Sequence, residues 1–531
     1  MDDESKFLQS ILFYNQACGI TKFDKEVVQI KKNSKIKTDV PITLVGLLRE
    51  LCFNKPQYYW KRDVADEVEK SLINYLNEGV EEFEEGFESS TTEFFESIRA
   101  YENITRTITE IRNVAFQESF KTTLFRNSIF SQICEDFLMN LYRFLKSIVN
   151  EYSEKDYSNL NTLGQIIPCL VKNGFAKSTK VNLNLRNAVN HGNVFVDGDT
   201  INYRFGKSPK DYENASMKYW DYDNIIDESY DIACGILIGI IRVIAQNPEI
   251  IIKHFERSEH NAFQWFRLMY KNPKVSIKYL NKGQVNEPQL NVNIETKIED
   301  HNHLVFALIE LAKGAFIQFP NYEKYFVGYT HNRSASGFIR VTRKDLTQTD
   351  EVASLYQKII DSQDMLIMPI LEQDINENAY KYHVFPNLNS DHYEVLDIKD
   401  CSITDFKRLK ATAILNKRYR KREIKNLISR IVKDMVHLKT PQNPYERTKF
   451  GEMEADIIFL NVFVNNPDRS KFNLFPDNTT FVCSVHYYKD NNCPRLKNGG
   501  VMASLWNAYK KEKLDKNIQL AWNPKYKSPI A

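Results

Sequence analysis

One run of apolar residues constrains the fold more than any other feature of this sequence. Between Ile129 and Val149, apolar side chains recur every three or four residues, the spacing of one buried face of an α-helix. A weaker helical pattern precedes it over residues 95–116, and a last apolar helix is expected over 223–246. Several amphipathic helices that share a core predict a helical bundle.

Two interruptions divide the region between these helices. A further helix is expected to begin near Leu163, to be interrupted by Pro168 and Gly174, and to resume further along. Residues 193–205 then alternate apolar and polar side chains around a glycine-containing turn, which is typical of a β-hairpin. For residues 91–250 we therefore expect a four-helix bundle with a small β-hairpin before its last helix.

The length of 531 residues is about twice that at which single cores usually stop growing, so we expect several domains. Residues 1–90 are predicted to form an N-terminal helical extension to the bundle. Residues 251–300 are expected to hold a linker and strands, and residues 301–531 an α+β domain that recognises RNA or regulates activity. Strand-like segments fall at residues 275–279, 290–294, 338–341 and 365–369. The predicted class for the whole chain is mainly α.

Residues 407–439 are rich in Lys and Arg, with apolar residues at helical spacing between them, and predict a basic helix. Such a helix could form an electrostatic track for RNA phosphates, with Tyr419 stacking on a base. The alternative is an ordinary solvated face of an amphipathic helix. The candidate RNA-binding residues are Lys417, Arg418, Arg420, Lys421 and Arg422.

Composition excludes several functional classes. The eight cysteines include no CxxC pair, which argues against a zinc knuckle or a redox dithiol and suits a reducing compartment. The acidic residues after Met1 do not resemble a secretory signal, and the apolar run Ile232–Ala245 is shorter than the ~20 residues that span a bilayer. No P-loop, GxSxG, HExxH or GxGxxG fingerprint occurs. A cytoplasmic protein without membrane contact is expected.

Residues 185–192 read LRNAVNHG and carry the clearest chemical signal in the chain. An arginine, Arg186, is followed by the polar Asn187 and, five residues after the arginine, by His191. This segment resembles the R-polar-xxx-H signature of the HEPN superfamily, and it precedes the final bundle helix, where such domains carry it. The resemblance covers only residues 91–250.

The residues suit RNA cleavage without any metal or cofactor, because RNA carries its own nucleophile, the 2′-OH. Histidine titrates near neutrality, so His191 is the candidate general acid or base. The guanidinium of Arg186 is suited to stabilise charge on the phosphoryl oxygens in the transition state. Asn187 could orient the imidazole or bind phosphate, or make a purely structural hydrogen bond. The glycine after His191 predicts that the histidine lies at a helix C-terminus.

The spacing of the two groups raises the question of a second subunit. Residues five apart on a helix point about 140° away from each other, so Arg186 and His191 of one chain need not reach the same phosphate. The resemblance implies a symmetric homodimer that brings both motifs to one groove. It also implies a metal-independent endoribonuclease that acts on RNA such as tRNA, used as a toxin or antiviral effector and restrained by an antitoxin or released by an activator.

Two other interpretations stay open. In the first, Arg186 and His191 only cap helices, and the domain is a non-catalytic nucleic-acid-binding or interaction module. In the second, His301 and His303, which would share one face of a strand, belong to a metal-dependent nuclease site, although no third ligand is identifiable. Another arginine and histidine pair, Arg430 and His437, is assigned to the basic helix.

Overall fold

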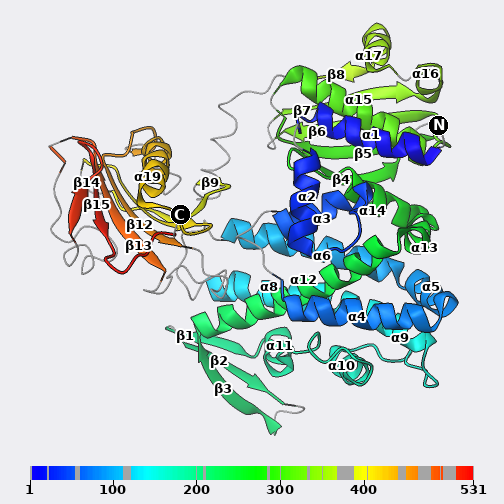
Figure 1. The fold of residues 1–531 in the computed structure, drawn as a ribbon, viewed down its shortest axis with the longest axis horizontal. Helices are drawn as coiled ribbons and strands as arrows, with labels where there is room; N and C mark the ends of the chain where they lie inside the picture. The colour runs from blue at the N-terminus through cyan, green and yellow to red at the C-terminus, as the bar shows by residue number, and fades with distance from the viewer. Residues whose placement is uncertain are drawn as a thin grey trace.

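The computed structural model describes residues 3–20, 23–53, 60–111, 121–198, 200–206, 211–283, 287–298, 300–331, 335–349, 351–367, 388–402, 405–439, 450–464, 480–490, 492–493 and 510–529 (Figure 1). Of these described residues, 54% are helical and 22% are in strands, and the strands form three sheets. The expectation of a mainly α fold is therefore wrong, because the second half of the chain contributes far more sheet than its short strand signals suggested. The fold is α+β.

Helices make up most of the N-terminal half. The predicted helix over 129–149 is confirmed as part of one continuous helix from Thr122 to Glu151, in which two π-helical turns alternate with α-helix. The predicted last helix is also confirmed, and it begins slightly earlier than expected. The elements are α1 (Asp3–Ala17), α2 (Phe23–Ser34), α3 (Val45–Leu48), η2 (Arg49–Phe53), α4 (Arg62–Glu78), α5 (Val80–Ser89), α6 (Thr91–Ile111), η3 (Thr122–Arg126), α8 (Asn127–Gln132), η4 (Ile133–Leu138), α9 (Met139–Glu151), α10 (Leu163–Lys172), α11 (Leu183–Asn190), α12 (Tyr219–Gln246), α13 (Pro248–Ile251) and α14 (Glu259–Met269).

A small antiparallel sheet lies beside α11. The predicted hairpin is confirmed by the pairing of Val194 with Tyr203 and of Asp197 with Thr200; Asp199 of its predicted turn lies outside the described residues. A third strand, which was not expected, pairs with the second. The strands are β1 (Val194–Asp197), β2 (Thr200–Phe205) and β3 (Glu213–Lys218), in that order.

Helix α12 packs along α4, which comes from the predicted N-terminal extension (Figure 1). Two glycines of α12 permit the close approach: a Cβ at Gly235 would lie 2.7 Å from the Lys61 carbonyl oxygen, and a Cβ at Gly239 would lie 2.7 Å from Val68 Cβ. Larger residues there would push the helices apart. The N-terminal helices thus share one hydrophobic core with the bundle.

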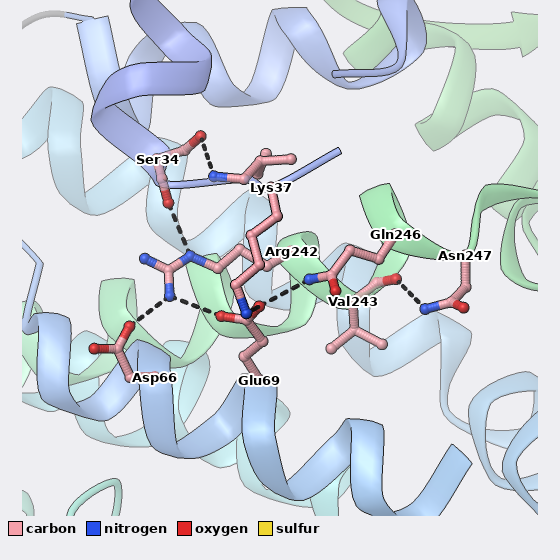
Figure 2. A network of polar contacts seen from close by, with 9 residues as sticks. Ser34, Lys37, Asp66, Glu69, Arg242, Val243, Gln246 and Asn247 are labelled. Atoms are coloured by element: carbon pink, nitrogen blue, oxygen red, sulfur yellow. Dashed lines mark hydrogen bonds and ion pairs between the residues drawn. The ribbon is translucent and has the colours of Figure 1, made fainter. Parts of the chain in front are cut away.

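A buried arginine joins three segments at the end of this interface. Arg242 of α12 is 1% exposed. Its Nη1 donates to Asp66 at 2.7 Å and to Glu69 at 3.0 Å, both on α4, and its Nε donates to the carbonyl oxygen of Ser34 at 2.8 Å (Figure 2). Because a buried guanidinium is costly without acceptors, these contacts favour one register of α12 on α4.

A five-stranded sheet follows the helices and shares their core, which extends to Ile359. Strands β5 and β6 run parallel because α15 (His301–Gln318) crosses between them, and the other neighbouring pairs are antiparallel. The boundary expected at residue 300 therefore falls inside this sheet. Of the strand expected over 365–369, Met368 and Pro369 lie outside the described residues. The order is β4 (Val275–Lys282), β5 (Gln289–Thr296), β6 (Lys324–His331), β7 (Ala335–Thr342) and β8 (Met365–Leu366), with α16 (Arg343–Gln348) and α17 (Val352–Asp361) between β7 and β8 in the chain.

The C-terminal residues form a second core around a seven-stranded sheet. Strands β11 and β12 are parallel and are joined across α19 (Lys421–Val436); the other neighbours are antiparallel. The sheet order is β14 (Lys511–Lys513), β15 (Ile518–Trp522), β13 (Phe481–Tyr488), β12 (Ile457–Val464), β11 (Arg408–Leu415), β10 (Tyr393–Asp400) and β9 (Leu388–Ser390).

The basic helix expected over 407–439 is only half right. Residues Lys421–Val436 are helical, but Arg408–Leu415 form a strand in the middle of the sheet. Burial alternates from Arg408 to Ala411, and Thr412 to Leu415 are all buried, as in a strand that is covered on both faces. This segment forms a strand because its backbone pairs with β10 on one side and with β12 on the other.

Among the described residues, no single helix has the length and apolar composition to cross a membrane. Two successive helical segments, Asp221–Gln246 and Pro248–Glu256, reach that length and apolar composition only when they are taken together, and the chain bends sharply between them. The apolar run of the first segment is buried in the core.

Candidate functional site

The LRNAVNHG segment forms a short helix with a defined start and end. The side chain of Asn182 caps the N-terminus of α11 by accepting a hydrogen bond from the Leu185 amide at 3.0 Å. Helical geometry ends at His191 (φ −93°, ψ 7°), and Gly192 has a φ of +69°. The amide of Asn193 donates to the carbonyl of Ala188 at 2.8 Å, which completes a Schellman motif. The prediction that His191 lies at a helix C-terminus is confirmed.

Packing of α11 against the long bundle helix sets the position of Arg186. Leu185 and Ala188 are buried toward the core, and α11 lies against α8 and β2 (Figure 1). Arg186 is thereby placed at the rim of this contact, with 19% of its side chain exposed. The arginine can present its guanidinium to solvent while its stem is packed.

An acidic residue that sequence reasoning missed holds the arginine. Arg186 Nε donates to Glu135 of η4, and Arg186 Nη1 donates to Asn187 Oδ1 at 2.9 Å. Glu135 Oε1 also accepts from Asn190 Nδ2 at 2.7 Å, and the Ser131 hydroxyl donates to Asn190 Oδ1 at 2.8 Å. Two polar side chains thus contact the guanidinium directly, and two more hold the Glu135 carboxylate in place. Nothing in the periodicity of the long helix distinguishes Glu135 from its other acidic residues.

The side-chain oxygen of Asn187 accepts a hydrogen bond from the neighbouring Arg186, so within the described structure it orients the arginine and not the imidazole. His191 is exposed at the end of α11. Within the described part of the chain, its ring makes no hydrogen bond. A Cβ at Gly192 would meet no atom within 4 Å, so the chain is also uncovered at the residue that follows the histidine.

The structure brings Arg186 and Asn187 together, but it leaves His191 on a separate part of the helix end. Five residues of helix correspond to a rise of about 7.5 Å and a turn of about 140°. No hydrogen bond joins Arg186 to His191 in the described structure. One chain therefore offers an oriented guanidinium and an unpartnered imidazole that face different directions.

The second arginine and histidine pair provides a useful comparison. His437 caps the C-terminus of α19 with nearly the same backbone conformation as His191 (φ −92°, ψ 4°). Its Nδ1 lies 3.5 Å from Glu454 Oε1. Arg430 is exposed about two turns earlier, on a regular helix. This pair has the same residue types as Arg186 and His191, but within the described residues no carboxylate or amide side chain holds the guanidinium of Arg430.

The five candidate RNA-binding residues lie in the connection from β11 to α19 and in the first turn of α19, where all are exposed. The ammonium of Lys417 lies 5.3 Å from the ring centre of Tyr419, and that of Lys421 lies 5.1 Å from the ring centre of Trp522. Arg418 Nη1 donates to the Lys527 carbonyl at 3.3 Å, whereas Arg420 and Arg422 extend the exposed basic surface. Tyr419 itself is 6% exposed, so its predicted stacking on a base is wrong.

The two histidines considered for a metal site lie in the first turn of a helix and not on a strand. Asp300 caps α15 by accepting from the His303 amide at 2.8 Å, and His303 Nδ1 lies 2.9 Å from the Ala17 carbonyl oxygen. On a helix, His301 and His303 point about 200° apart, so they do not share a face. In the part of the chain that the structure describes, no three His, Cys, Asp or Glu residues are grouped as metal ligands would be.

Comparison with known proteins adds no further resemblance: no family model, no curated protein and no solved structure matches this chain.

Proposed function

We propose that the protein is an endoribonuclease that cleaves RNA by attack of the 2′-OH, with Arg186 and His191 as its catalytic residues. The observation that carries the proposal is the anchored arginine: the Glu135 carboxylate and the Asn187 side-chain amide orient a guanidinium on α11, and His191 is exposed at the C-terminal end of the same helix.

In this reaction a base takes the proton of the 2′-OH, the 2′-oxygen forms a bond to phosphorus, and the bond from phosphorus to the 5′-oxygen breaks as that oxygen gains a proton. The products are a 2′,3′-cyclic phosphate and a 5′-OH. His191 serves as the base or the acid. The N–H groups of Arg186 that Glu135 and Asn187 leave free donate to the phosphoryl oxygens as their charge grows.

We infer that the active form is a two-fold homodimer. Since Arg186 and His191 of one chain face different directions, a second copy of α11 across a groove would supply the missing partner to each. The exposed basic surface at the start of α19 would hold the RNA strand through its phosphates. We also propose that the enzyme is a toxin or antiviral effector in the cytoplasm. Its C-terminal sheet domain, together with an antitoxin or activator, would control its activity.

A second candidate function is a non-catalytic RNA-binding module. The ion pair of Arg186 with Glu135 favours it to some extent, because the same contact also fastens α11 to the bundle. In that case the arginine would matter for stability, and the exposed histidine would be dispensable.

Cleavage in excess EDTA tests the proposal directly. Purified full-length protein would be incubated with total RNA and with tRNA, and the product ends mapped, for wild type, Arg186→Ala and His191→Ala. Arg430→Ala and His437→Ala are matched controls, since they remove the same side chains from the other pair. Cleavage by wild type and both controls, but by neither site variant, is the expected result.

Activity that survives in both site variants, or that EDTA abolishes, would contradict the proposal. If the wild type binds RNA without cutting it and His191→Ala binds equally well, the binding module is the better description.

A further inference from the structure

A basic groove separates the helical bundle from the open face of the five-stranded sheet. It consists of two hollows of about 490 Å³ and 750 Å³, which meet at Arg106, Lys278 and Glu295. Each is within the size range of small-molecule sites in proteins. The groove is built from α6, the turn after α14, and strands β4 to β7, none of which belongs to the Arg186 and His191 site.

The sheet side of the groove is flat and partly aromatic. Helix α15 packs against β6 and β7, and the side chains between are buried, whereas residues of the opposite parity face the groove. Along one row of this open face, Tyr279 pairs with Asn293, Asn293 with Gly328, and Gly328 with Phe338. The sheet thus presents an amide and aromatic rings around a glycine.

The glycine keeps the hollow open. A Cβ at Gly328 would lie 3.0 Å from both Asn293 Oδ1 and Phe326 Cε1. Phe338 stacks on Phe326, with ring centres 5.0 Å apart and planes inclined by 26°, which holds the Phe326 ring at the border of the hollow. Tyr279 is 54% exposed on the edge strand β4. A planar ligand could therefore lie over Gly328, against these rings.

The helical side of the groove is cationic. Seven basic side chains and three acidic ones line the larger hollow, and each acidic one is already paired. Glu50 and Glu102 bind Lys271, and Glu295 binds Lys278. The basic residues are Arg99, Arg106, Arg267, Lys271, Lys274, Lys278 and Lys297, and the acidic ones are Glu50, Glu102 and Glu295.

Three of the basic residues have no such neutralising contact. Arg106, Lys274 and Lys297 are exposed, and none forms an ion pair within the described residues. Arg106 lines both hollows, whereas Lys274 and Lys297 line the larger one, which adjoins the aromatic hollow. Unpaired cations beside a groove attract an anionic ligand.

We propose that this groove binds a nucleotide unit, with its base against Tyr279 and Phe326 and its phosphate toward Arg106, Lys274 and Lys297. The side-chain amide of Asn293 makes no hydrogen bond in the described structure. It therefore offers one donor group and one acceptor to the edge of a base. Stacking rings next to phosphate-binding cations are the usual elements of single-strand nucleotide recognition. An acidic peptide would use the cations but would leave the flat hollow unfilled.

The nucleotide could be a free ligand or one residue of an RNA strand. Binding would be measured with the full-length His191→Ala protein, so that no cleavage interferes, by titrating AMP, ATP and a fluorescein-labelled 12-nucleotide single-stranded RNA. The test variants are Lys274→Glu with Lys297→Glu, and separately Tyr279→Ala. Their controls are Lys344→Glu, an exposed lysine on α16, and Phe306→Ala, which replaces a side chain that is 40% exposed on α15.

Charge reversal of the two lysines should weaken binding of whichever probe binds by about tenfold or more at low salt, and Tyr279→Ala by about fivefold or more. The controls should stay within about twofold. If the RNA binds more tightly than AMP and ATP, the natural ligand is an RNA strand. If AMP or ATP binds more tightly than the RNA, the natural ligand is a free nucleotide. Failure of all three probes to bind at about 1 mM, or equal binding by groove and control variants, would overturn the proposal. Neither result depends on whether the protein cuts RNA.

Discussion

Arg186 and Glu135, 51 residues apart in the chain, form an ion pair between α11 and the long bundle helix. The contact has two effects. It fastens a short helix whose own hydrogen bonds could not keep it stable, and it orients the arginine that the proposed reaction needs.

The first prediction separates these two effects. Glu135→Gln keeps the shape of the side chain but removes its charge, so the guanidinium should lose its fixed orientation and the single-turnover cleavage rate should fall by about 10- to 100-fold. Since the pair is partly exposed, the free energy of unfolding should change by no more than about 1 kcal/mol. Asp136→Asn, at the next position of the same helix, should leave the rate unchanged. A wild-type rate for Glu135→Gln would mean that Arg186 does not need the anchor.

The second prediction concerns the source of the two catalytic groups. If Arg186 of one protomer works with His191 of its partner, a heterodimer of Arg186→Ala and His191→Ala chains retains one complete site. Random exchange in an equal mixture should then restore about one quarter of wild-type activity, although each variant alone is inactive. Rates would be measured after joint refolding of the two chains. No recovery would show that both groups act within one chain.

The third prediction tests the close packing of α12 on α4. Gly239→Ala should lower the free energy of unfolding by about 1–3 kcal/mol, because the added methyl group would meet Val68 and the Ala65 carbonyl. Gly164→Ala makes the same chemical change in α10, where nothing lies within 4 Å, and should be neutral or stabilising by up to about 1 kcal/mol. Urea denaturation followed by circular dichroism gives both values. Equal effects of the two substitutions would argue against a close approach of these two helices at Gly239.

The fourth prediction is a pH dependence in the C-terminal unit. Lys407 is fully buried and donates to the carbonyl oxygens of Leu438 at 2.5 Å and Met453 at 2.6 Å. Burial lowers the pKa of its ammonium to about 8, although nearby carboxylates, Asp400 first, oppose the shift. Between pH 8 and the pKa of about 10.4 for an unfolded lysine, the unfolded chain binds more protons, so this group makes the folded state more stable as pH rises.

Lys407→Met should remove that contribution. The free energy of unfolding would be measured for wild type and variant from about pH 7.5 to 9.5; tyrosines, with a reference pKa of about 10, begin to ionise near the upper limit but do so in both proteins alike. The difference between the two proteins should grow with pH in favour of the wild type. A constant difference across this range would show that the lysine keeps an ordinary pKa.

Much of the helical half could be read from the residues alone. The long helix, the hairpin and the helix end at His191 were all predictable, because each depends on a local pattern: a period of three and four, an alternation around a turn, and a glycine after the last helical residue. The strands of the sheets were harder to predict from the sequence. Strand β12, with all eight residues buried, has the apolar composition of a central strand, but period alone could not assign it.

Some features of the candidate site could likewise be predicted from local sequence patterns, whereas others depended on tertiary packing. The amino-acid sequence was sufficient to place an arginine, an asparagine and a histidine on one short helix, because local hydrogen bonds and a glycine in the left-handed region define where that helix ends. Tertiary packing was needed to bring Glu135 to Arg186, to make Arg408–Leu415 a strand, and to place Tyr279 in one groove with Arg106. These contacts join residues far apart in the chain, and they depend on how whole helices and strands pack, which no local spacing encodes.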